Sequence, residues 1–134
     1  MRYLGVAAAA LIVLPPATVA AAGHPWQLAT ATSVTAGVNS RSTFAIDAYV
    51  TLPLSCYATR ILTYKVTQGL NREFAVYQQQ PPALCTGGPY KCTVRQTFAL
   101  PIQQKFEVFT KGKTWEVHLA MHEPMPVEPM CHKS

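Results

Sequence analysis

The chain has 134 residues, with eleven Lys and Arg against six Asp and Glu and a formal net charge of +5. The basic residues are spread along the chain without a dense block, which gives little support to nucleic-acid binding. Beyond the N-terminal segment, no apolar stretch approaches the roughly 18–20 residues that a membrane-spanning helix needs. We therefore expect no membrane span after that segment is removed.

The first 22 residues have the pattern of a secretory signal peptide. Arg2 supplies the positive start, an apolar run follows over residues 4–14, and three alanines at 20–22 precede Gly23. Cleavage there leaves about 112 residues, enough for one small domain. We expect a secreted or periplasmic protein, whose four cysteines form disulfides in an oxidising compartment.

Strands and turns are predicted along the rest of the chain. Residues 23–41 are rich in Ala, Thr, Ser and Gly, and this composition predicts a flexible leader that holds at most an edge strand, over 27–32. The domain proper is expected over 42–121. Its first strand runs from Thr43 to Leu52, where apolar and polar residues alternate. Similar patterns predict strands over 58–67, 73–79, 93–100, 105–110 and 114–120, the last two forming a hairpin around Gly112.

No helical period follows residue 23, so the sequence predicts an all-β fold, an antiparallel β-sandwich of about six to seven strands. The core is expected to hold the apolar residues on one side of these strands. In the run 58–67 both sides carry apolar residues. The expected core residues of the other strands are Phe44, Ile46, Ala48, Val50, Leu52, Phe74, Val76, Val94, Phe98, Leu100, Phe106, Val108, Trp115, Val117 and Leu119.

Four cysteines, Cys56, Cys85, Cys92 and Cys131, allow three pairings, among which sequence alone does not choose. We favour Cys56–Cys85 with Cys92–Cys131, which ties the C-terminal tail to the loop before the strand over 93–100. The rival arrangement closes a local Cys85–Cys92 loop and pairs Cys56 with Cys131. Each bridge is expected to contribute roughly 2–4 kcal/mol by restricting the unfolded chain.

Three features together resemble a family of small exported bacterial proteins with Ig-like β-sandwich folds. They are a strand ending in Leu-Pro-Leu-Ser-Cys at 52–56, a Pro-Pro-Ala-Leu-Cys segment at 81–85, and a closing hairpin around Gly112. The resemblance covers roughly residues 42–120. It implies an Ig-like sandwich with a Cys56–Cys85 bond. The family looks like uncharacterised envelope or secreted proteins, and the resemblance implies no catalytic residues.

Residues 122–134 form a tail rich in Met, His and Pro. Thioethers and imidazoles are suited to copper, and a flexible Met/His segment wraps Cu(I) without a rigid cage. This gives an alternative function, an extracytoplasmic copper-binding protein, beside the plainer interpretation of solvated side chains. Cys131 supplies no thiolate if it is oxidised. The candidate metal ligands are His118, Met121, His122, Met125, Met130 and His132.

The loop between Cys85 and Cys92 is the candidate contact loop for a protein partner, with Pro89, Tyr90 and Lys91 at its tip. Several aromatic residues outside the expected core either cover the sheet or form a recognition face. These are Tyr49, Tyr57, Tyr77, Tyr90 and Phe109.

No paired-carboxylate spacing, nucleophile elbow or phosphate-binding loop is present, so no enzyme is expected. The sequence therefore predicts an exported, non-enzymatic module for protein interaction or envelope association. No cofactor is assigned to it apart from the copper alternative.

Overall fold

The computed structural model describes residues 23–67, 71–83 and 85–132, so the predicted signal peptide lies outside the described residues. Within that part of the chain no helix is long and apolar enough to cross a membrane. Eight strands are present there, where about six to seven were expected. They are β1 (Gln27–Leu28), β2 (Thr30–Val38), β3 (Thr43–Leu52), β4 (Ala58–Thr67), β5 (Asn71–Gln79), β6 (Tyr90–Ala99), β7 (Lys105–Thr110) and β8 (Lys113–Ala120).

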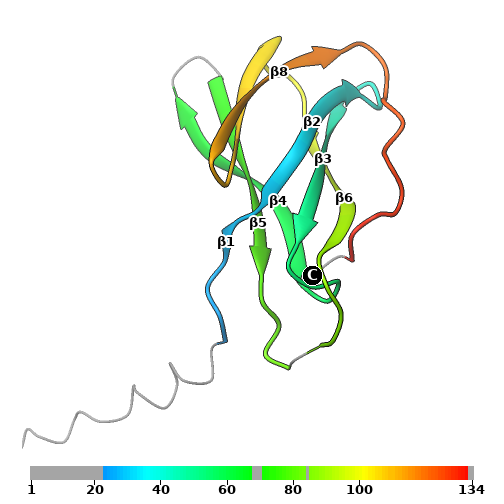
Figure 1. The fold of residues 1–134 in the computed structure, drawn as a ribbon. Coiled ribbons are helices and arrows are strands. Elements are labelled where there is room, and N and C mark those ends of the chain that lie inside the picture. Colours follow the sequence, from blue (N-terminus) through cyan, green and yellow to red (C-terminus); the bar gives the residue numbers. More distant parts are fainter. Residues whose placement is uncertain (1–22, 68–70, 84, 133–134) are drawn as a thin grey trace, which may run out of the picture.

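The strands form one hydrogen-bonded path in the order β1-β5-β7-β8-β2-β3-β6, and β4 joins this path on β5. Most neighbours are antiparallel, but β2 runs parallel to β8 and β5 runs parallel to β7. Figure 1 shows that the path curls, with β4 and β5 on one side and β3 and β6 on the other. The expected all-β fold is confirmed. The sheet is mostly antiparallel, but two strand pairs are parallel where an antiparallel sandwich was predicted, and its form is a curled half-barrel.

Alternation along the strands places one face of each strand in a shared core. Five alternate residues of β3, from Phe44 to Leu52, are at most 1% exposed, as their spacing predicts. Phe74 and Phe106 pack their rings on Phe44 with centroids 6.0 and 5.8 Å away. Of β4, whose two faces looked alike in sequence, Ile61 is the buried apolar residue.

The predicted strand ends agree closely with the structure because proline and glycine mark them. β3, β4 and β7 have the predicted bounds, β5 and β8 begin one or two residues earlier, and β6 differs from the prediction at both ends. Pro53 follows β3, and the hairpin between β7 and β8 turns at Gly112, whose φ of 77° suits glycine.

The prediction of a flexible leader or edge strand over 23–41 is wrong at Ala36 and Gly37. β2 pairs with β3 along nearly its whole length and also with β8 at these two residues, so only this end of β2 is interior to the sheet. The N–H of Ala29 donates to the carbonyl oxygen of Val76 (2.9 Å), which anchors the crossing from β1 to β2. Small residues give this segment a low hydrophobicity, yet it is ordered as a strand, and its end at Ala36 and Gly37 lies between β3 and β8.

The favoured disulfide pairing is present: Cys56 is bonded to Cys85, and Cys92 to Cys131. The first bond joins the turn after β3 to the loop after β5. The second joins β6 to the C-terminal tail. The rival pairing of Cys85 with Cys92 is therefore wrong.

Candidate functional site

The C-terminal tail is an ordered strap, residues 121–132, which crosses the face of β2, β3 and β6 that lies opposite the core. Above β2 it passes so close that a Cβ on Gly37 would lie 2.3 Å from the carbonyl oxygen of His122. Further along, Arg95 donates to the carbonyl oxygen of Pro124 (3.0 Å), and the hydroxyl of Thr93 donates to that of Val127. The strap is thus held by the backbone of the sheet and by polar side chains on its outer face.

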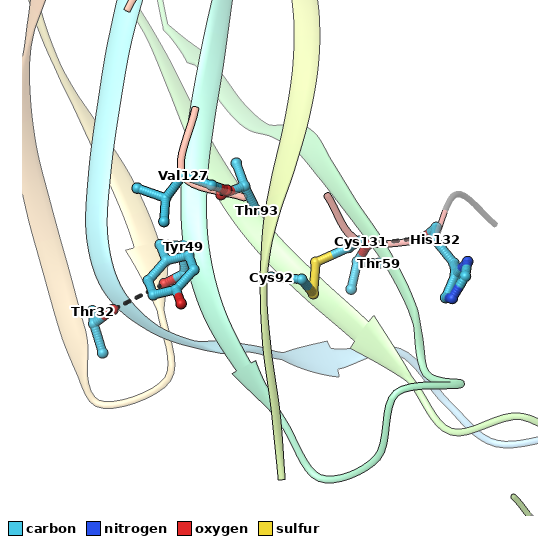
Figure 2. The surroundings of a disulfide bond; sticks show 8 residues. All are labelled: Thr32, Tyr49, Thr59, Cys92, Thr93, Val127, Cys131 and His132. Atoms are coloured by element: carbon cyan, nitrogen blue, oxygen red, sulfur yellow. Dashed lines mark hydrogen bonds between the residues drawn. A yellow bond between two sulfur atoms is a disulfide. The ribbon is translucent and has the colours of Figure 1, made fainter. Parts of the chain in front are cut away.

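Beyond Val127 the strap pairs with the free edge of β6. The N–H of Thr93 donates to the carbonyl oxygen of Pro129, and the N–H of Cys131 donates to that of Thr93, both at 2.8 Å. Figure 2 shows Cys131 bonded to Cys92, with Thr59 and His132 beyond it. The Thr59 hydroxyl donates to the carbonyl oxygen of His132 (3.4 Å), so the strap extends from β6 to β4.

A buried ion pair lies beneath the strap. Asp47 is only 5% exposed, and its two oxygens accept from Nε and Nη2 of Arg95 at 2.7 and 2.9 Å. Arg95 also forms a salt bridge to Glu123 on the strap. The hydrogen bond to Asp47, with the charges of Asp47 and Glu123, raises the pKa of Arg95 against the opposing effect of its partial burial. The guanidinium therefore stays charged, and the buried carboxylate keeps its partner.

The predicted metal ligands are distributed along β8 and the strap. His118 lies on the exposed face of β8, and Met121 and Met125 are 75% and 93% exposed. Met130 forms a bridge to Thr93 at the far end of the strap. In residues 23–67, 71–83 and 85–132, no group of three or more His, Cys, Asp or Glu is arranged to hold a metal ion. Cys131 is oxidised, and the copper hypothesis stays a prediction.

The expected covalently closed loop between Cys85 and Cys92 is absent, because each cysteine is bonded elsewhere. Cys92 is fully buried on the core side of β6, facing away from the loop. Tyr90 begins β6 and packs partly buried against the core, so it does not lie at a loop tip. Of the three predicted contact residues, Pro89 and Lys91 are exposed.

The predicted outer aromatic residues occupy three different environments. Tyr57 and Tyr90 pack against the core. Tyr49 lines a small crevice of about 120 Å³ beneath the strap. Tyr77 and Phe109 lie on the outer face of β5 and β7, opposite Phe74 and Val108 of the core.

Sequence reasoning missed the exposed apolar side chains of β4. Leu62, Tyr64 and Val66 are 41%, 59% and 64% exposed, and the Tyr64 ring lies 5.0 Å from that of Phe109. The register between β4 and β5 shifts at Tyr64, which is the extra residue of a β-bulge. Since apolar residues occur on both sides of this run and no local signal marks the bulge, the sequence did not show which side faces solvent.

A groove of about 560 Å³ lies between β4 and β6 and is bounded at one end by the strap. Two arginines, Arg60 and Arg95, and one histidine contribute to its wall, and no Asp or Glu does so among the described residues. Arg95 is paired as described above. The residues that line the groove are Thr59, Arg60, Thr93, Val94, Arg95, Gln96, Thr97, Met130, Cys131 and His132.

Arg60 is the cation without a carboxylate partner in this groove. Its guanidinium stacks over the ring of Trp26, 3.9 Å from the ring centroid. Its Nε is buried and has no hydrogen-bond partner, and within the described part of the chain Arg60 forms no salt bridge. No sequence pattern distinguished this arginine from the other basic residues.

Comparisons with known proteins found no matching protein family and no significantly similar curated protein or solved structure.

Proposed function

We propose that this chain is an exported, non-enzymatic, Ig-like binding module that acts in the periplasm or outside the cell on a protein partner. The N-terminal signal pattern and the two disulfides support an oxidising location. The Ig-like assignment is supported by strands on two sides of one core and by the sequence resemblance.

One observation carries the binding function: β4, which among the described residues pairs with β5 alone, exposes Leu62 and Tyr64, and the Tyr64 ring lies against that of Phe109. A group of large exposed apolar side chains is typical of a surface that another protein covers. Aromatic side chains are also enriched at the centres of protein interfaces, because they bury much area with few rotatable bonds. The partner is therefore expected to cover the outer part of β4.

Affinity capture from the exported fraction of the host, followed by mass spectrometry, tests this function. The double variant Leu62→Ser and Tyr64→Ser is expected to lose the captured partner. A matched control, Met121→Ser and Val127→Ser, changes two exposed apolar residues on the strap and is expected to retain it. Urea unfolding of both variants verifies that each is folded. Equal capture by the two variants would refute a contact surface on β4.

A further inference from the structure

At one end of β6 the strap forms an isolated β-bridge, and the rest of the outer edge of β6 pairs with no described residue. In this bridge the N–H and C=O of Thr93 both bond to strap residues. The register of β3 with β6 has no shift, and alternate residues direct their backbone groups to the same edge. The N–H and C=O groups of Arg95 and Thr97 therefore face the groove, where no described residue outside the sheet bonds to them.

The opposite wall of the groove is also a strand edge. β4 has ten residues and, in the part of the chain that the structure describes, pairs with β5 alone, so its other edge carries backbone donors and acceptors along its length. Exposed edges of this kind accept an extended segment by strand addition, in which main-chain hydrogen bonds supply affinity. The groove between β4 and β6 is thus lined by two strand edges, and an extended polypeptide can pair with either one of them.

Charge indicates which polypeptide fits. Arg60 brings a positive charge to the groove, and no carboxylate of the described residues forms a salt bridge with it. Leaving such a group unpaired costs more than leaving a neutral donor unpaired, so a carboxylate oxygen is the complementary ligand. A second copy of the chain is a poor occupant, because pairing β4 with β4 brings Arg60 and Lys65 of the two copies near one another.

We propose that the groove between β4 and β6 binds an extended, acidic segment of the partner protein by strand addition. The segment pairs with the outward backbone groups of Arg95 and Thr97, and one of its carboxylates bonds to Arg60. This inference rests on the proposed function, since it names the part of the partner that the module holds. The exposed apolar residues of β4 lie on the strand that forms one wall of this groove.

A synthetic acetylated peptide, Thr-Val-Glu-Val-Thr-Val-Glu-Val-Thr, is the probe, and the same peptide with Gln in place of Glu is its control. Titration into the isotope-labelled full protein, followed by NMR, is expected to shift the amides of Arg95 and Thr97 and to slow their hydrogen exchange. The Gln peptide is expected to bind at least about tenfold more weakly, because a hydrogen bond to a charged group is lost.

Variants of the protein test both contacts. Arg60→Gln is expected to weaken the Glu peptide about tenfold. Lys111→Gln, in the turn between β7 and β8, removes the same charge and is expected to leave binding unchanged. Thr97→Pro removes one outward N–H at an edge position that tolerates proline. In this variant the peptide is expected to give no exchange protection to the remaining amide, that of Arg95.

The proposal is overturned if the Glu peptide shows no saturable binding up to about 1 mM, or if binding leaves the amides of Arg95 and Thr97 unchanged. Equal affinity of wild type and Arg60→Gln also overturns it. Concentration-dependent dimerisation that shifts these amides without peptide assigns the groove to a second copy instead. Loss of partner capture in the Leu62 and Tyr64 variant, with no peptide binding in the groove, rejects this inference and leaves the proposed function intact.

Discussion

Gly37→Ala tests whether close contact with the strap determines the residue at this position of β2. An alanine Cβ would lie 2.3 Å from the carbonyl oxygen of His122 and 2.7 Å from Cδ of Pro124. Carbon–oxygen contacts in proteins lie at about 3.3 Å or more, so the strap must move outward by about 1 Å. Alanine gains roughly 0.5–1 kcal/mol over glycine within a strand, whereas overpacking costs about 1–3 kcal/mol. We expect a net loss of about 1–2 kcal/mol in the free energy of unfolding.

Urea unfolding measures this loss as a lower midpoint at an unchanged slope. The control is the same substitution in a chain that ends at Ala120 and carries Cys92→Ala, where no strap opposes the new methyl group. There alanine is expected to be neutral or to stabilise by up to about 1 kcal/mol. Hydrogen exchange of the Cys131 amide in the full chain gives a second readout, since its bond to Thr93 reports the position of the strap. Equal destabilisation with and without the strap would refute the reasoning.

Replacing both Cys92 and Cys131 by Ser is expected to lower the free energy of unfolding by about 4 kcal/mol, because the disulfide closes a loop between residues 39 apart in sequence and so restricts the unfolded chain. An unchanged urea midpoint would contradict this. Arg95→Met is expected to cost about 3 kcal/mol in the same measurement, because the nearly buried Asp47 loses its partner, and a cost below that of a surface substitution would show that the pair is dispensable. Trp115→Phe removes an indole N–H that donates at 2.9 Å to a buried hydroxyl of the hairpin, and thermal unfolding is expected to show a loss of about 1 kcal/mol.

The strands of this fold were predictable because local chemistry decides them. In β3 every second residue is apolar and Pro53 follows, so the alternation and the breaker agree on the end of the strand. The parallel contacts of β2 with β8 were not predictable, because they join segments far apart in sequence. The segment around Ala36 and Gly37 has a low hydrophobicity. It is held in the sheet by hydrogen bonds to two neighbouring strands, β3 and β8.

The candidate sites were less predictable, because composition does not tell which partner a side chain will meet. The pattern of Met and His in the tail pointed to metal chemistry, yet the described contacts of the tail are made chiefly by its backbone and by Glu123. The groove depends on two strand edges, and Arg60 belongs to it only because β4 faces β6 across the open side of the half-barrel. A single sequence has no pattern that shows which strand edges lack a partner.

The prolines of the tail explain why the strap covers β6 without becoming a full strand. Pro124, Pro126 and Pro129 favour extended backbone but have no N–H to donate, so a continuous ladder with β6 is excluded. What remains is a single bridge at Thr93, made by the carbonyl oxygen of Pro129 and the N–H of Cys131, and the disulfide keeps it in place. The bridge protects the Thr93 end of the β6 edge from pairing with strands of other chains, and it does not reach Thr97. The chain thereby limits where another polypeptide can add to the sheet, and that place is the groove beside Arg60.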